Sequence, residues 1–162
     1  FFLIFSISQA NENIKFININ YIIMNSDAGK VLNNLIEKKN IKFSNELNKI
    51  GKSLEDKKNK IISQKNILKK EEFEKLVKEY DIEVKNFNEK RKKKNNELNN
   101  FSAMSKKKIL DLLNPLIKDY LQKESIQILL QKEKIIFGDE KLDITKEILD
   151  KFNSKHKSIK FE

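Results

Sequence analysis

The feature that most constrains the fold is a narrow apolar stripe at steps of three, four or seven residues. Its members are Leu32, Ile36, Phe43, Leu47, Ile50, Leu54, Ile61 and Leu68. This spacing is typical of the contact line of a coiled coil, so the segment is expected to form one long helix that needs a partner helix. The stripe loses its phase around residues 66–70, where we expect a tight hairpin.

A second stripe follows the hairpin and supplies that partner. Its members are Phe73, Leu76, Tyr80, Val84, Phe87, Leu98, Phe101, Ile109 and Leu112. Between Phe87 and Leu98 the corresponding positions are charged, at Arg91 and Lys94. Two antiparallel helices of about 40 residues, each about 60 Å long, are predicted. The single proline, Pro115, should kink the returning helix or restart it at Asn114.

The N-terminal end of the chain predicts a strand followed by a capped helix start. Residues 14–21, "IKFININY", alternate apolar and polar side chains as strands do. Ser26 can cap the helix that follows, and Asp27 complements its dipole.

The C-terminal end predicts two short strands and one short helix. The strands are expected at residues 125–131, "SIQILLQ", and 135–137, "IIF", with a turn at 138–140. The helix, "LDITKEILDKFN", is expected to be capped by Asp143 or Thr145.

Together these elements predict a mainly α fold with a small β-body. The N- and C-terminal segments, about 14–30 and 116–155, form the body, and a coiled-coil arm over about 31–115 projects from it. Residues 11–162 would be a single domain. Because a few short strands and one helix make a marginal core, we expect copies of the chain to complete it as an oligomer.

The first ten residues resemble the remainder of a secretory signal peptide. "FFLIFSI" is apolar, and Ser8 and Ala10 are the small residues that signal peptidase accepts before a cut. We expect cleavage after Ala10 and a protein that works outside the cytoplasm. The alternative interpretation is a hydrophobic first strand.

The chain is strongly basic, with a formal net charge of +10. Such charge suits a nucleic acid, an anionic membrane surface or an acidic protein as partner. The candidate residues for steering such a partner are Lys85, Lys90, Arg91, Lys92, Lys93, Lys94, Lys106, Lys107 and Lys108.

The sequence offers little material for catalysis or for a cofactor. It has no cysteine and one histidine, and no Gly-rich phosphate loop or metal-ligand spacing appears. Its acidic residues interleave with lysine as helix-surface pairs do. We therefore expect neither an enzyme nor a bound cofactor or metal.

Two segments resemble the Skp/OmpH family of periplasmic chaperones. They are "IKFININYIIMNSDAGK" and "SIQILLQKEKIIFGDEKLDITKEILDKFN", and the most specific match is the motif Leu142, Asp143, Ile144 and Thr145. The resemblance implies a jellyfish-shaped homotrimer whose helical arms enclose a cavity. It further implies an ATP-independent holdase for unfolded outer-membrane proteins. Some members have been linked to lipopolysaccharide, but no residue here can be assigned to it.

Two alternatives remain open from the sequence. One is a basic coiled-coil protein that binds anionic lipid or nucleic acid, although no aromatic residue is interleaved with the basic cluster for base stacking. The other is a prefoldin-like cytosolic chaperone, which only the leading peptide and the Leu142–Thr145 motif argue against.

Overall fold

The structure is a computed structural model that describes residues 13–161. The predicted signal peptide, residues 1–10, lies outside them. The described chain divides into two compact units. We call residues 13–31 with 106–161 the terminal unit and residues 32–105 the hairpin unit.

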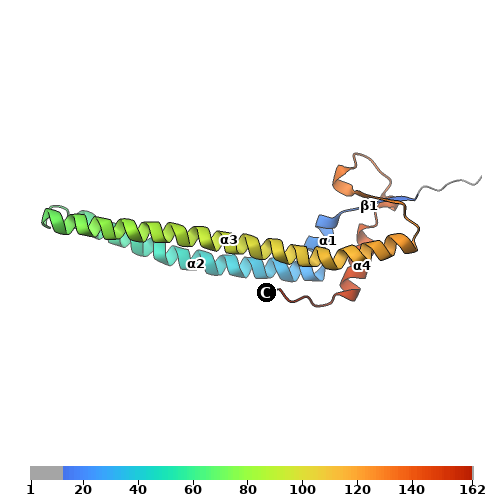
Figure 1. The fold of residues 1–162 in the computed structure, drawn as a ribbon, viewed down its shortest axis with the longest axis horizontal. Helices are drawn as coiled ribbons and strands as arrows, with labels where there is room; N and C mark the ends of the chain where they lie inside the picture. Colours follow the sequence, from blue (N-terminus) through green and yellow to red (C-terminus); the bar gives the residue numbers. More distant parts are fainter. Residues whose placement is uncertain (1–12, 162) are drawn as a thin grey trace, which may run out of the picture. The chain divides into compact units, whose positions relative to one another are not determined.

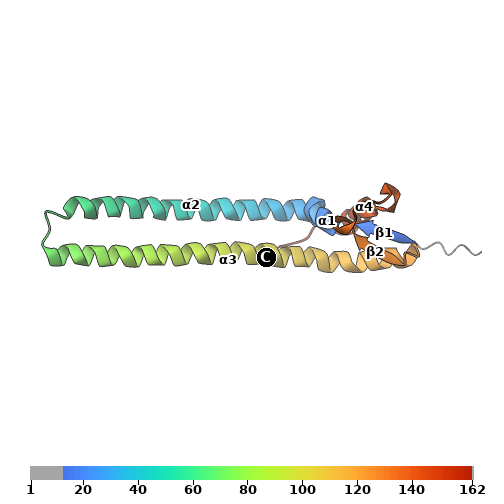
Figure 2. The same cartoon turned by 90° about the horizontal axis from the view of Figure 1, so that it is seen from above.

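The hairpin unit contains most of two long helices. Helix α2 spans Asp27–Gln64 and helix α3 spans Lys70–Lys123. They run side by side in opposite directions in both ribbon views (Figures 1 and 2). In the connection, the backbone N–H groups of Ile67 and Leu68 both donate to the Gln64 carbonyl at 3.0 Å. The predicted helical hairpin and its turn are thus confirmed, with α3 longer than expected.

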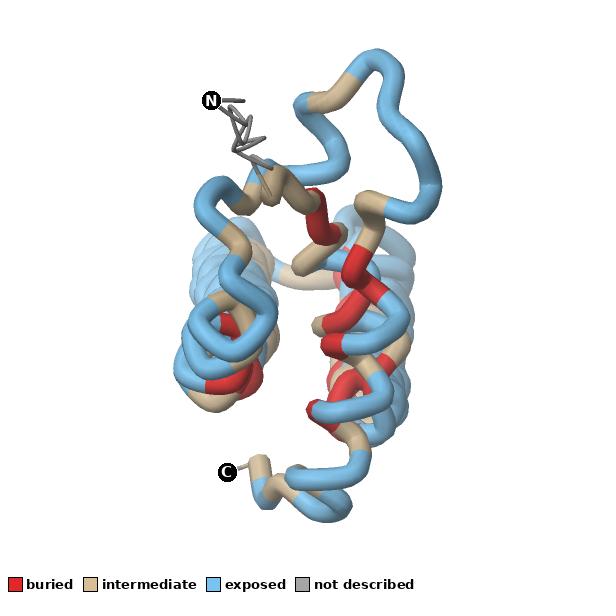
Figure 3. The backbone as a smooth tube through the Cα atoms, turned by 90° about the vertical axis from the view of Figure 1, so that its right-hand side faces the viewer, coloured by how far each residue is buried: buried red, intermediate tan, exposed pale blue. Residues whose placement is uncertain are grey.

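The contact line between the two helices is only partly buried. Phe43, Leu54 and Ile61 are buried, whereas most other members of the predicted stripes, including Phe87 and Leu98, are half-buried. Most residues of the two long helices are exposed, the class that Figure 3 colours pale blue, and few are in the buried class, coloured red. A pair of helices can bury only one stripe of each, so this unit has almost no interior.

Pro115 does not interrupt α3, which corrects the expectation that the helix would restart at Asn114. The proline lies inside the helix and has no N–H to donate to the carbonyl four residues earlier. Its neighbours Leu113, Leu116 and Ile117 are all buried. Packing of this segment within the terminal unit therefore outweighs the local penalty of the proline.

The sheet has two parallel strands. Strand β1, Ile14–Ile17, pairs with β2, Ile128–Gln131, with Ile14 opposite Ile128 and Ile17 opposite Gln131. The prediction that the first strand continues to Tyr21 is wrong, because helix α1, Ile19–Asn25, begins there. The Asn18 side chain accepts a hydrogen bond from the Tyr21 N–H at 2.7 Å and caps α1.

The predicted strand at residues 135–137 is also wrong. After β2 the chain forms two short 3-10 turns, η1 (Lys132–Lys134) and η2 (Glu140–Leu142). Between them, Ile136 and Phe137 are almost fully exposed, at 104% and 96%. No neighbouring strand of the described chain pairs with this segment.

The core of the terminal unit is small and well buried. Helix α4, Thr145–Lys155, packs against α1 and presents Ile148 and Phe152 to the interior. These two side chains, together with Ile17, Ile22 and Leu113, are at most 1% exposed. The two ends of the chain therefore form one core, as the sequence predicted.

None of the helices in residues 13–161 is long and apolar enough to cross a membrane.

Candidate functional site

All nine candidate basic residues lie on helix α3, but they are not equivalent. Lys90 and Lys94 both contact the Glu46 carboxylate of α2, at 2.7 and 2.9 Å. Lys107 pairs with Asp111 at 2.6 Å, and Lys108 donates to the Lys160 carbonyl at 2.8 Å. Three of the nine are thus in ion pairs, and a fourth, Lys108, is held by a hydrogen bond to a backbone carbonyl.

Glu46 is the residue that sequence analysis missed in this cluster. Side-chain hydrogen bonds from Lys90 and then Lys94 lower the pKa of Glu46 to about 2. The Lys94 ammonium also lies 4.2 Å from the centroid of the Phe43 ring, a cation–π contact. Because Glu46 and the lysines lie on different helices, no spacing within the basic stretch could reveal the pairing.

The other five candidate residues carry charge without an ion-pair partner in the described chain. They are Lys85, Arg91, Lys92, Lys93 and Lys106, and each is exposed. Of these, Arg91 has the most distinctive surroundings, because it lines a hollow between α2 and α3.

That hollow, which we call the hairpin groove, has a volume of about 880 Å³. It lies along residues 40–52 of α2 and 87–98 of α3. Phe43 and Phe87 line it, and Lys49, Lys52 and Arg91 are its three cations. No carboxylate is among the residues that line it. Lys49 and Lys52 were not predicted, because lysines are spread along the whole of α2 and give no distinctive pattern.

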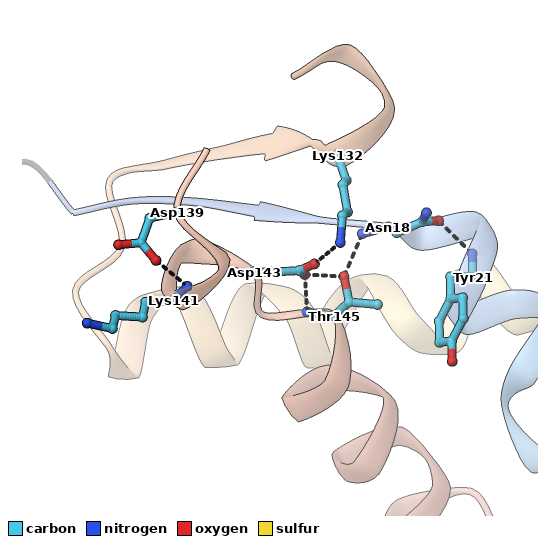
Figure 4. Close-up of polar contacts among 7 residues, drawn as sticks. All are labelled: Asn18, Tyr21, Lys132, Asp139, Lys141, Asp143 and Thr145. Carbon is cyan, nitrogen blue, oxygen red and sulfur yellow. Dashed lines mark hydrogen bonds and ion pairs between the residues drawn. The ribbon is translucent and has the colours of Figure 1, made fainter. Parts of the chain in front are cut away.

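The predicted motif at Leu142–Thr145 has a structural role in the terminal unit (Figure 4). The Asp143 carboxylate accepts from the Thr145 backbone N–H at 2.9 Å and from its hydroxyl at 2.5 Å. The Thr145 hydroxyl oxygen in turn accepts from the backbone N–H of Asn18 at 2.8 Å. The N-cap position of α4 is occupied by Ile144, whose side chain makes no capping hydrogen bond, and not by Asp143 or Thr145 as predicted. Asp143 instead accepts from the N–H of the first helical residue, while Thr145 ties α4 to the segment after β1.

Lys132 completes this cluster from the segment after β2. Its ammonium contacts the second oxygen of the Asp143 carboxylate at 2.5 Å. Burial alone would raise the pKa of Asp143, but hydrogen bonds from Lys132 and Thr145 outweigh it and hold that pKa below its ordinary value. The hydrogen bond to Asp143 raises the pKa of Lys132. The motif thus links the segments that follow both strands, at one end of the parallel sheet, to α4 and is a folding element.

An exposed apolar surface is the second unusual feature of the terminal unit. Ile128 and Leu130 of β2 are 46% and 44% exposed, and Ile136 and Phe137 follow in the next segment. The outer edge of β2 has no strand partner among the described residues. Open edges and large exposed apolar side chains are typical of surfaces that another chain covers.

Nothing in residues 13–161 assembles three histidine, cysteine or acidic side chains that could hold a metal ion. Within the same residues every buried polar side-chain atom has a hydrogen-bond partner.

Comparison with known proteins decides the family. The profile of the family described as outer membrane protein (OmpH-like) matches residues 13–152. The chain belongs to the OmpH-like family. This family is one of chaperones and not of enzymes, in agreement with the sequence analysis.

Solved structures agree on the fold of this OmpH-like protein. A crystal structure from Caulobacter crescentus, of a protein assigned as an outer membrane chaperone (OmpH-like), matches with a TM-score of 0.82. The alignment covers 94% of this chain and 90% of that chain at 15% sequence identity, so it establishes the fold alone. No curated protein sequence matches the chain.

Proposed function

We propose that this OmpH-like protein is an ATP-independent periplasmic holdase that binds unfolded outer-membrane proteins and prevents their aggregation before insertion. The observation that carries the proposal is the surface of the hairpin unit, where the half-buried ring of Phe87 lies in the same groove as cations without ion-pair partners. A binder of many unfolded chains needs such adaptable, partly apolar surface rather than one enclosed pocket. Family membership supports the same role.

The basic residues of α3 would act by steering. Lys85, Arg91, Lys92, Lys93 and Lys106 leave a large positive charge available to an acidic client, even after Glu46 has bound Lys90 and Lys94. Complementary charge raises association rates. Exposed charges are screened over about 8–10 Å at physiological ionic strength, so capture should weaken as salt rises.

We further propose a homotrimer whose helical arms enclose the client in a basic cavity. The open edge of β2 and the exposed side chains of Ile136 and Phe137 are the surface that other copies would cover. The small core of the terminal unit gives a physical reason for assembly, because burial between copies would add to it.

The periplasm is the proposed location, with a signal peptide removed after Ala10. Amino-terminal sequencing of the protein from the periplasmic fraction should then give Asn11 as the first residue.

The test of the holdase function dilutes a urea-unfolded β-barrel membrane protein into buffer with and without the chain, while light scattering is followed. Suppression near one oligomer per client that weakens with salt is the expected result. Suppression that ignores salt would keep the holdase and remove the steering role of the lysines. A lack of suppression at every ratio would contradict the proposed function.

Binding of anionic lipid, including lipopolysaccharide, is the second candidate. The unpaired cations of α3 are the observation that favours it, since basic helices associate with anionic membrane surfaces. Sedimentation with anionic vesicles, under conditions where no client is protected, would be the result that supports it. Nucleic acid is disfavoured because the proposed location separates the protein from it.

A further inference from the structure

We infer that the hairpin groove is a discrete capture site for short extended client segments in which acidic and apolar side chains alternate. The inference rests on the proposed holdase function and names the client feature that a single hairpin would recognise. It assigns the contact to the groove of a single helical pair, a groove that every copy of the chain carries.

Charge is the first argument for this occupant. The groove is lined by Lys49, Lys52 and Arg91 and by no carboxylate. None of the three cations has an ion-pair partner in residues 13–161. By contrast, the neighbouring Lys90 and Lys94 are both paired with Glu46. The chain therefore pairs the two cations next to the groove with one carboxylate and leaves those in the groove available to an anionic partner.

Chemical variety within the groove is the second argument. Phe87, with the small exposed part of Phe43, offers apolar contact, and four asparagines, Asn40, Asn45, Asn48 and Asn95, offer both donors and acceptors. A phosphate or a simple anion would use only the cations. An acidic polypeptide would use all three kinds of group, because its backbone can bond to the amides while its carboxylates meet the cations.

The dimensions fit an extended segment. The groove follows α2 over residues 40–52, which is about 18 Å at the rise of an α-helix. An extended chain covers that length with about five residues. Successive side chains of such a segment point to opposite sides, so alternate residues would face the phenylalanine rings and the cations.

Gly51 gives a further argument, after charge, chemical variety and dimensions. It lies inside α2, where glycine is a poor helix former, and its backbone conformation does not require glycine. A Cβ at this position would meet only the Phe87 ring, in ordinary contact at 4.0 Å. The absence of a side chain at Gly51 therefore keeps the groove open beside Phe87 at the expense of helix propensity.

The test measures binding of a dansyl-labelled peptide that alternates aspartate with phenylalanine, using the full chain and fluorescence anisotropy. The variant K49Q/K52Q/R91Q removes the three cations of the groove. The matched variant K58Q/K75Q/K78Q removes three exposed lysines elsewhere on the same hairpin. Loss of the groove cations should weaken binding about tenfold, the size expected for three exposed ion pairs, and the matched variant should bind nearly as the unchanged chain does.

The variant Gly51→Leu tests the groove without removing charge. Leucine favours the helix and would occupy the space beside Phe87, so helicity should be kept while peptide binding falls. Circular dichroism of every variant separates lost binding from lost folding. The same peptide with asparagine in place of aspartate should bind weakly to all of them.

The outcomes distinguish this inference from the holdase function. Equal losses in the two triple variants, or unchanged binding by Gly51→Leu, would overturn the groove. A chain that protects the unfolded β-barrel protein but does not bind the peptide would also overturn the groove and leave the holdase standing. Binding of phosphatidylglycerol vesicles without peptide binding would point to lipid and would equally count against the inference.

Discussion

The terminal unit and the hairpin unit differ in how they bury apolar side chains. In the terminal unit Ile22, Leu113, Ile148 and Phe152 have no exposed surface. In the hairpin unit Leu32, its first residue, is 1% exposed, but farther along the helices even Phe43, Leu54 and Ile61 keep 7–8% exposure, and most members of the apolar stripes are half-buried. The terminal unit depends on close packing, whereas the hairpin unit leaves part of its apolar surface accessible to a partner.

The comparison predicts its largest contrast for phenylalanine truncations. Phe152→Ala should lower the free energy of unfolding by about 3–5 kcal/mol, because it leaves a cavity in a closely packed core. Phe87→Ala in the hairpin unit should cost only about 1–2 kcal/mol, because that ring is already partly exposed. Urea unfolding followed by circular dichroism, at equal protein concentration, measures both. Equal losses would mean that the hairpin is packed as closely as the core.

Two glycines should sharpen the same contrast with effects of opposite sign. A Cβ at Gly29 would overlap the backbone carbonyl of Ile23, so Gly29→Ala should destabilise by about 1–3 kcal/mol. At Gly51 a Cβ would make only ordinary contact with Phe87, so Gly51→Ala should stabilise by about 0.5–1 kcal/mol through helix propensity. Thermal unfolding of the two variants side by side is the measurement. A stabilised Gly29→Ala variant would contradict the close approach of α1 and α2.

These contrasts also explain what the sequence could predict. The hairpin follows from the spacing of apolar residues within each helix, which is local information, and so it was predicted with its turn. The start of α4 next to the Leu142–Thr145 motif was predicted for the same reason, although its N-cap position falls on Ile144. The continuity of α3 through Pro115 was not, because it depends on burial of Leu113, Leu116 and Ile117 in a core formed by distant segments.

The errors in the predicted strands and in the predicted site residues also arise because contacts between distant segments are not visible in the local sequence. The alternation of residues 14–21 suits a strand, but Asn18, in the middle of this segment, is the N-cap of helix α1. The alternation alone does not decide between a continuing strand and the start of a helix. Residues 135–137 have the composition of a strand and find no partner in the described chain. Glu46, Lys49 and Lys52 belong to the site only because α2 lies beside α3.

A smaller effect is expected at the polar cluster of the terminal unit. Asp143→Asn removes the ion pair with Lys132 and weakens the hydrogen bond to the first backbone N–H of α4, which should cost about 1–2 kcal/mol near neutral pH. The pKa of Asp143 is lowered in the folded chain, so its contribution is present above the ordinary aspartate pKa and is lost as pH falls through the folded value. The difference between the unchanged chain and the variant should therefore fade in acid.

Lys132 sets the upper pH limit of the range in which its ion pair with Asp143 stabilises the fold. Its pKa is raised by Asp143, so the contribution is present below the ordinary lysine pKa and is lost as pH rises through the folded value. Urea unfolding across the pH range tests both limits, with Asp150→Asn as a matched control on exposed α4 surface. A loss of unfolding free energy that does not depend on pH would show that Asp143 acts through packing and not through its charge.

The smallest effect is expected for Glu46→Gln in the hairpin unit, because the ion pairs that it removes are solvent-exposed. The melting temperature should fall slightly at neutral pH. The pKa of Glu46 is lowered to about 2, so its contribution is complete above the ordinary glutamate pKa and disappears as pH falls through about 2. High salt should shrink the same difference, unlike the packing loss of Phe152→Ala. Glu79→Gln, on exposed surface of the same hairpin, is the control and should change neither melting nor its salt dependence.

Because Glu46→Gln also releases Lys90 and Lys94, it should lower stability without slowing the capture of an acidic client. A variant that loses both would show that the hairpin surface requires the order that these ion pairs provide.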